Sequence, residues 1–391
     1  MKLLVVSDYY MYSHKGKYYF QSKEKYDFFH RYLRIFESIK IVTRCIEENM
    51  LRKGRILLDE EKIEYCPVPE FHGAMQYLKK YFIVGKAISK LLEGCNAVIM
   101  QLPSTISQRI APIVMKSGIP YAVEVVYDAQ DGWISETNII TRFLWKRIDK
   151  QMKKICTQAD GVACVTEFYL QKHYFSLKKK HFVANYSSLA LDKSFYYSSR
   201  TYPSKKRMVI AHVANKVFYK GRKGHIELVQ AINILKMKGL VVDVKFVAEL
   251  VGNNKERLLE LAKVLKVDSQ ISFCGYLNRD ELNELLTSVD LFVLPTKAEG
   301  LPRVIIEAMA KGLPCVSTMV SGNSELISKD YLVDYDNVNA LALRIEELVT
   351  SPTLYEKASK ENFKNSLKYE ASLLEKRRDL FYLKLKSLCK V

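Results

Sequence analysis

The segment Ser288–Val316, SVDLFVLPTKAEGLPRVIIEAMAKGLPCV, decides the fold. It opens with the apolar run Leu291–Leu294, whose length and composition predict a fully buried strand. A polar loop follows the strand. A helix is then indicated by Pro302 at its first position and by Gly312 where a left-handed cap is expected. The segment therefore predicts a strand, a short loop, a helix and a second strand.

This succession of elements places a ligand at the carboxyl end of a parallel sheet. The start of the helix offers free N–H groups and a positive dipole end, which suit phosphate. Glu299 lies in the loop, and Glu307 lies about one and a half turns into the helix. A carboxylate in the first turns can accept hydrogen bonds from two adjacent hydroxyls, as acidic residues do with a ribose. The alternative is that both glutamates lie on a solvated helix face.

The whole segment resembles the donor-site signature of retaining glycosyltransferases of family four. The resemblance is carried by Glu299-Gly300-Leu301-Pro302, Glu307-Ala308-Met309-Ala310, Gly312 and Pro314, with seven residues between the two glutamates. It implies the α/β fold called GT-B, in which two Rossmann-like domains with doubly wound parallel sheets face each other across a cleft. It also implies that Glu307 holds the ribose and that Glu299 is the catalytic residue beside the donor sugar. Gly300, Leu301 and Pro302 would line the donor site.

Length and strand pattern agree with two domains. The chain has 391 residues, and apolar runs alternate with helical segments along it, which indicates doubly wound parallel sheets. The polar, basic stretch 198–206 is the predicted linker. We therefore expect an acceptor-side domain at 1–200 and a donor-binding domain at 205–371. By resemblance, a final helix at about 372–391 packs back on the first domain.

Composition predicts a cytoplasmic protein with anionic partners. The eight cysteines lack paired spacing, and Met1–Asp8 predicts a first strand instead of a signal peptide. The formal charge of +18 favours nucleotide diphosphates, anionic lipid or nucleic acid, of which nucleic acid is the least expected. Gln76–Glu93 predicts an amphipathic helix with lysines on one face, and His173–His181 is a basic run. Both suit the inner surface of the cell membrane, although a solvated face is the better interpretation of each.

The loop 215–224 is basic and contains glycine, as the leaving diphosphate requires. By resemblance, Lys223 with Gly224 forms the lysine–glycine pair that binds the phosphates, and the pair Lys220-Gly221 is a rival. Lys216 falls where the family has an earlier cation, and Arg222 is an alternative to it. Tyr276 follows another predicted strand, where it could contact the base or pack against the fold.

The acceptor side is less defined. Asp128 and Arg109 are candidates there, together with Glu124 and Asp131, and each carboxylate taken singly is more readily structural. Many relatives have a histidine at the position of Tyr127, and tyrosine cannot take its ionic role at neutral pH. A retaining transfer needs no strong enzyme base when the departing phosphate oxygen takes the acceptor proton. Asp334-Tyr335-Asp336 is interpreted as a turn, so no metal and no cofactor are expected.

Together these features predict a retaining, metal-independent glycosyltransferase. It would move a sugar from a UDP or GDP donor to a saccharide or lipid-linked saccharide, in the synthesis of a surface polysaccharide or glycoconjugate. One alternative is a nucleotide-sugar epimerase of the same fold, which would form product without an acceptor. The other is a basic binding subunit that has lost activity, which would bind tightly and salt-sensitively without nucleotide.

Overall fold

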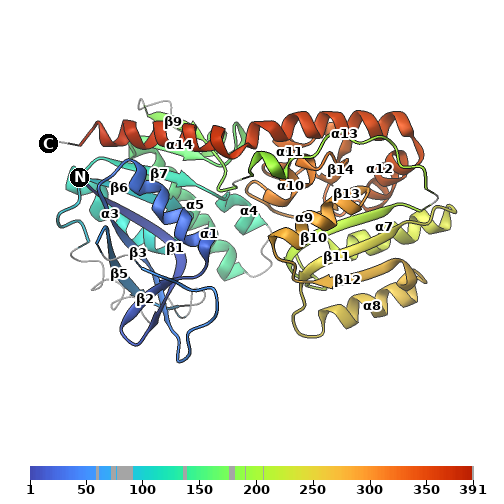
Figure 1. The fold of residues 1–391 in the computed structure, drawn as a ribbon, viewed down its shortest axis with the longest axis horizontal. Coiled ribbons are helices and arrows are strands. Elements are labelled where there is room, and N and C mark those ends of the chain that lie inside the picture. The colour runs from blue at the N-terminus through green and yellow to red at the C-terminus, as the bar shows by residue number, and fades with distance from the viewer. Residues whose placement is uncertain are drawn as a thin grey trace. The chain divides into compact units, whose positions relative to one another are not determined.

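A computed structural model describes residues 1–58, 61–71, 76, 91–134, 139–175, 181–189, 191–205 and 207–389 (Figure 1). The chain divides into two compact units, the first formed by Met1–Ser188 with Glu375–Val391 and the second by Leu189–Leu374. Each unit is built around its own mainly parallel sheet with helices against it. The predicted α/β class with two doubly wound sheets is therefore confirmed.

The first unit contains, within the described residues, a nine-stranded sheet. Its main path runs β4-β2-β1-β6-β7-β8-β9, and β3 and β5 branch from β1. All pairings are parallel except those of β2 with β1 and with β4. The strands are β1 (Lys2–His14), β2 (Lys17–Phe20), β3 (Ser38–Glu47), β4 (Ile56–Leu57), β5 (Ile63–Pro69), β6 (Ala97–Leu102), β7 (Tyr121–Val125), β8 (Gly161–Cys164) and β9 (Phe182–Asn185).

Helices pack against this sheet and bury its central strands. Every residue of β6 and β7 is buried, as expected of parallel strands covered on both faces. The described helices are α1 (Lys23–His30), α3 (Thr105–Ser117), α4 (Ala129–Ile134), α5 (Ile139–Gln158), α6 (Tyr169–Tyr174) and, from Glu375 on, the C-terminal α14 (Ala371–Lys386), with a 3-10 turn at Arg31–Arg34.

The second unit has a six-stranded parallel sheet with the order β12-β11-β10-β13-β14-β15. Its strands are β10 (Val209–Lys216), β11 (Asp243–Glu249), β12 (Ile271–Gly275), β13 (Leu291–Leu294), β14 (Cys315–Thr318) and β15 (Leu332–Val333). Its helices are α7 (His225–Met237), α8 (Asn254–Val264), α9 (Arg279–Ser288), α10 (Arg303–Ala310), α11 (Asn323–Leu326), α12 (Val338–Thr350) and α13 (Pro352–Ser366).

The deciding segment folds as predicted, with one difference. Leu291–Leu294 is a fully buried central strand, and Gly312 has a left-handed φ of 68°. Helix α10 begins at Arg303, one residue after the predicted start, because Pro302 has an extended conformation and caps the helix. The ring of Pro302 lacks the N–H that this position would leave without a partner.

The predicted linker 198–206 lies inside the second unit. Arg200 holds this stretch there, since its guanidinium donates to the carbonyl oxygens of Lys311 at 2.8 Å and Leu286 at 2.7 Å. The unit therefore begins at Leu189, earlier than the sequence boundary near residue 205. The last segment, Glu375–Val391, belongs to the first unit.

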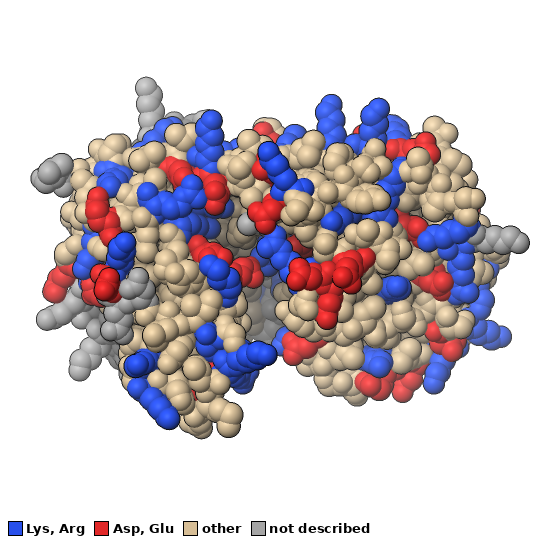
Figure 2. All heavy atoms as spheres, viewed as in Figure 1, with Lys and Arg blue, Asp and Glu red and all other residues tan. Residues whose placement is uncertain are grey.

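Two basic segments of the sequence are only partly described. The predicted helix Gln76–Glu93 lies outside the described residues except for its two ends, and so do residues 176–180 of the run His173–His181. Lys and Arg side chains are spread over both units on the face in Figure 2, with Asp and Glu among them. Within the described ranges, no helix is long and apolar enough to cross a membrane.

Candidate functional site

The site in the second unit is built where β10 and β13 run side by side. The two strands pair in parallel, Ile210 with Leu291 and Ala211 with Phe292, so the loops that follow them leave the same edge of the sheet. The backbone joins these loops directly, since the Lys297 amide donates to the Arg222 carbonyl at 2.7 Å. The basic loop and the Glu-Gly-Leu-Pro loop therefore form one surface.

A lysine–glutamate ion pair lies at the centre of this surface. The Lys223 ammonium donates to Oε1 of Glu299, and the Thr296 hydroxyl oxygen lies 3.1 Å from the same carboxylate oxygen. The Glu299 side chain is 13% exposed and that of Lys223 is 30% exposed, so both charges are partly shielded and still reachable. Two side chains predicted for separate roles in the donor site are thus in direct contact. Thr296 was not a predicted site residue, and the available signal was its position in the loop, separated from the buried strand only by Pro295.

Glycine brings the two loops together. Gly224 has a left-handed φ of +73°, and a Cβ built there would lie 2.0 Å from the carbonyl oxygen of Pro295. Only glycine tolerates both the conformation and this approach. Gly224 is also the N-cap of α7. The free N–H groups and the positive dipole end of this helix therefore lie next to Lys223.

The turn after β14 packs against the same motif. The Gly322 amide donates to the Gly300 carbonyl at 3.1 Å, and a Cβ at Gly322 would lie 2.4 Å from that oxygen. Gly322 is the N-cap of α11, and the Asn323 side-chain amide donates back to β14, to Ser317 Oγ at 2.9 Å.

Two buried histidines lie on the strand and the helix that flank the basic loop. The rings of His212 on β10 and His225 at the start of α7 lie 4.7 Å apart. Burial, together with the Lys223 charge, lowers the pKa of His225 to about 4. Burial is also the main cause that lowers the pKa of His212, followed by the charge of His225. Both rings are therefore neutral at pH 7, and sequence reasoning did not single them out.

The other predicted donor residues lie on the same unit. Leu301 and Pro302 are buried in the loop, and Glu307 is half-buried on α10. Lys216 forms an ion pair with Glu249 at 3.5 Å, with both side chains about half exposed. Tyr276 is 77% exposed after β12, which removes the packing alternative for this residue. Roles for Lys216, Arg222, Tyr276 and Glu307 in donor binding stay predictions.

Asp128 in the first unit is held by three hydrogen bonds. Its fully buried carboxylate accepts from the Tyr174 hydroxyl at 2.7 Å and from the Gln130 amide at 2.8 Å, and it lies 2.7 Å from Nδ1 of His173. These contacts fix the start of α4 against α6 and account for Asp128 structurally. The second acceptor-side candidate, Arg109, is half-buried on α3. Acceptor-side roles for both residues stay predictions.

Glu124 is the centre of a buried polar cluster. The carboxylate pairs with Arg31 at 2.9 Å and accepts from the hydroxyls of Tyr186 at 2.9 Å and Tyr382 at 2.7 Å. Burial raises the pKa of Glu124, but the Arg31 charge and the tyrosine hydroxyls prevail, and its pKa is lowered overall. Loss of any of these partners would leave the buried charge less compensated, which is costly, so the contacts account for Glu124 structurally.

Comparison with solved structures shows the class of fold. Sucrose-phosphate synthase from Thermosynechococcus elongatus superimposes with a TM-score of 0.73 at 13% identity, over 99% of each chain. HepE from Anabaena, solved with UDP and glucose, superimposes with a TM-score of 0.66 at 15% identity, over 99% of this chain and 100% of that one. The chain has the GT-B fold, with two parallel sheets.

Sequence comparison adds the domain and a relative of full length. Residues 202–365, which include Lys223, Glu299 and Glu307, match the family model of glycosyl transferases group 1. Protein CapJ of Staphylococcus aureus is 24% identical over 391 residues, 99% of this chain and 96% of that protein. The putative colanic acid biosynthesis glycosyltransferase WcaL of Escherichia coli is 30% identical over 133 residues, 32% of each chain. Together these matches support a GT-B glycosyltransferase.

Proposed function

We propose that this protein is a retaining glycosyltransferase that takes a sugar from a nucleoside diphosphate. The proposal rests chiefly on the contact of Lys223 with Glu299 at the carboxyl edge of the second sheet. A diphosphate beside this pair finds a fixed cation and the amino end of α7, and the attached sugar finds a carboxylate.

Lys223 and Glu299 have different tasks in this proposal. As the bond from the anomeric carbon to the phosphate oxygen breaks, negative charge grows on the leaving diphosphate. Lys223 and the amides of α7 stabilise that charge. Glu299 stabilises the positive charge that develops on the sugar ring, and Thr296 orients its carboxylate through the shared oxygen.

The acceptor proton passes to the departing phosphate oxygen in the proposed mechanism. The acceptor oxygen then bonds to the anomeric carbon on the face that the phosphate leaves, so the configuration is retained. The chain supplies position and charge, and needs no general base. Because Lys223 and the basic loop provide the positive charge, we propose that transfer is independent of metal, and that chelation by EDTA leaves the rate unchanged.

The acceptor class that we propose comes from relatives that are named for the synthesis of saccharides. WcaL is named for colanic acid biosynthesis, and another relative, LpsE of Rhizobium meliloti, for the lipopolysaccharide core. We propose a saccharide or lipid-linked saccharide acceptor in the synthesis of a surface polysaccharide or glycoconjugate. UDP is the first nucleotide to test, because HepE was solved with UDP and glucose.

Calorimetric titration with UDP and GDP, without added metal, tests the donor site first. We expect saturable binding of one nucleotide and weaker binding by Glu307→Ala, because the ribose loses its carboxylate. Glu284→Ala on α9 is the control, since it removes an exposed carboxylate from a helix of the same unit that carries none of the proposed donor residues. Failure of both nucleotides to bind would refute the proposal, and sugar product formed without an acceptor would favour an epimerase.

A further inference from the structure

The carboxyl edge of the first sheet brings Asp128 and His173 together. Strands β7 and β8 pair in parallel up to Val125 and Cys164, so the segments that follow them leave the sheet at the same edge. Asp128 is the third residue after β7, and His173 lies on α6, the helix that follows β8. Open α/β sheets bind their ligands at this edge. The two side chains therefore lie where a ligand of the first unit is expected.

The Asp128 carboxylate fixes which nitrogen of the His173 ring carries a proton. It is fully buried, and its Oδ2 lies 2.7 Å from Nδ1 of the ring. Its Oδ1 accepts from the Tyr174 hydroxyl at 2.7 Å and from the Gln130 amide at 2.8 Å. A carboxylate surrounded by donors acts only as an acceptor, so Nδ1 carries the proton. Nε2 of the neutral ring therefore keeps its lone pair and can accept a hydrogen bond.

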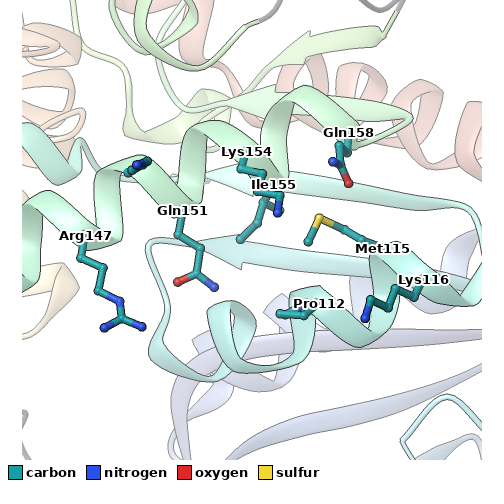
Figure 3. Close-up of a pocket in the computed structure, with 9 residues that line it drawn as sticks. Pro112, Met115, Lys116, Arg147, Gln151, Lys154, Ile155 and Gln158 are labelled. Atoms are coloured by element: carbon teal, nitrogen blue, oxygen red, sulfur yellow. The ribbon is translucent and has the colours of Figure 1, made fainter.

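Helix α5 presents different faces to this cluster and to α3. Oδ1 of Asp149 lies 3.2 Å from the Tyr174 hydroxyl oxygen. Gln151 lies about 200° further round the helix and donates to a carbonyl oxygen of α3 at 2.7 Å. It also lines the hollow between α3 and α5, together with four cations (Figure 3). Asp128 and His173 are not among the described residues that line this hollow, so the histidine lies at a different part of the surface.

Nε2 of His173 is open to a ligand. The side chain is 28% exposed, and within the described part of the chain this nitrogen has no hydrogen-bond partner and is not buried. Tyr169 lies one turn earlier on α6, with its ring centroid 5.0 Å from that of His173 in an edge-on arrangement. A precisely placed polar atom beside an aromatic ring is typical of sites that orient small molecules. Because a neutral nitrogen accepts a hydrogen bond and offers no charge, it suits a hydroxyl better than a phosphate.

We propose that Nε2 of His173 accepts a hydrogen bond from a hydroxyl of the acceptor saccharide, and that Asp128 positions the ring for this contact. That the ligand is a saccharide rests on the proposed function, since a glycosyltransferase holds a hydroxyl compound as its acceptor. The hydroxyl at His173 is a neighbour of the reacting one, whose proton passes to the departing phosphate. His173 therefore contributes to acceptor affinity and to the choice of acceptor, and not to proton transfer.

Nitrogen NMR on protein with isotope-labelled histidine tests the orientation of the ring. Long-range proton–nitrogen spectra near neutral pH should show Nδ1 of His173 protonated and Nε2 unprotonated, and loss of the signal in His173→Gln identifies it. In Asp128→Asn the side-chain oxygen still accepts from Tyr174 and Gln130, while the amide donates to Nδ1 of the ring. The proton should then move to Nε2. A wild-type ring protonated at Nε2, or an unchanged ring in Asp128→Asn, would overturn the proposal.

Binding of simple saccharides tests the contact itself. The probes are the methyl α-glycosides of glucose, galactose, mannose and N-acetylglucosamine, titrated by saturation-transfer NMR with and without UDP. We expect at least one of them to bind the wild type, and His173→Asn to bind it about tenfold more weakly through loss of one hydrogen bond. His173→Gln should retain more of the affinity, because its amide oxygen reaches the place of Nε2. A purely structural histidine predicts the reverse order, since the shorter amide keeps the contact with Asp128.

His181→Asn is the matched control. Nδ1 of His181 also lies 2.7 Å from a protein oxygen, the Ala159 carbonyl, but the residue precedes β9 at the amino edge of the same sheet. Its glycoside binding should equal that of the wild type, and circular dichroism should show that all variants are folded. Failure of every glycoside to bind, equal affinity in His173→Asn and the wild type, or a larger loss in His173→Gln would overturn the inference. The proposed function fails separately, when neither UDP nor GDP binds in calorimetry.

Discussion

Lys223 and Glu299 lie 76 residues apart in the chain and meet because β10 and β13 are neighbours in the sheet. The motif predicts each residue separately, because local spacing indicates a phosphate loop and a carboxylate. Their contact depends on strand order and register, which local spacing does not encode. Thr296 was not predicted as a site residue for the same reason. Its hydroxyl contacts both loops, and local spacing does not show that these loops meet.

Replacing the Glu299 carboxylate should separate catalysis from binding. We expect Glu299→Gln to lower kcat by about a hundredfold or more, because a carboxylate that acts on the transition state is lost. Nucleotide affinity should change much less, since Lys223 remains and loses a competing partner. Steady-state kinetics and calorimetry measure the two effects. Glu307→Gln should show the opposite pattern, and equal losses in kcat and affinity for Glu299→Gln would contradict the assigned role.

Gly224 provides a test of the close approach between the loops. Gly224→Ala should lower the free energy of unfolding by about 3 kcal/mol or more, because strain at positive φ adds to a clash with the Pro295 carbonyl. Gly239→Ala is the control, with φ +81° and no atom within 4 Å of the added Cβ, and should cost about 1 kcal/mol. Urea denaturation measures both free energies. If Gly224→Ala and Gly239→Ala lost similar amounts of unfolding free energy, the two loops would separate easily at little cost.

At the scale of elements, apolar runs were predicted better than the ends of helices. Leu291–Leu294 is recognisable as a strand because a short apolar run between turn residues is typical of a fully buried strand. The end of α1 shows the difference, because a 3-10 turn at Arg31–Arg34 follows the helix. Arg31 turns there toward the buried Glu124 carboxylate, a partner 93 residues away that no local pattern reveals.

The contact between β10 and α7 should make the second unit sensitive to acid. His225 has a pKa of about 4 in the folded chain, against about 6.5 when unfolded. The unfolded state therefore binds more protons between these values. Stability is fully present above pH 6.5 and falls as the pH approaches 4, by up to about 3 kcal/mol for this ring.

Urea denaturation followed by circular dichroism measures this loss across the pH range. His225→Gln should be less dependent on pH than the wild type, because its side chain does not titrate. His30→Gln, in the first unit, is the control and should keep the full dependence of the second unit. If the unfolding free energies of the wild type and of His225→Gln changed with pH in the same way, titration of His225 would not be the cause of the acid sensitivity. The comparison between variants cancels the carboxylates that titrate in the same range.

For the whole molecule, sequence predicted two α/β units and misplaced their junction. The stretch 198–206 has the composition of a linker, yet the Arg200 guanidinium fixes it through backbone carbonyls. Composition records polarity, but it does not show whether a basic side chain points to solvent or to a carbonyl. The assignment of Glu375–Val391 to the first unit likewise depends on contacts with residues far earlier in the chain.

The C-terminal helix should control the stability of the first unit. Both tryptophans, Trp133 and Trp145, belong to that unit, so their fluorescence reports on it alone. Tyr382→Phe should lower its unfolding free energy by about 2 kcal/mol, because Glu124 loses a hydrogen bond to a charged group. Deletion of 375–391 should lower it further, since Phe381 and Leu385 are also buried.

Tyr355→Phe is the matched control for these variants. Its hydroxyl is also buried and hydrogen-bonded, to the Asp290 carbonyl at 2.9 Å, but it lies in the second unit. The tryptophan transition of this variant should match that of the wild type. A first unit that unfolds at the wild-type urea concentration after the deletion would show that α14 contributes nothing to it.

The return of the C-terminal helix also sets an order of events during synthesis. A ribosome releases the chain from its amino end, so residues 1–188 emerge first but lack Glu375–Val391. The second unit, Leu189–Leu374, is continuous and can close as soon as it has left the exit tunnel. Of the two units, the one that is made first is therefore completed last, because the buried carboxylate of Glu124 lacks the hydroxyl of Tyr382 until the segment Glu375–Val391 has been made.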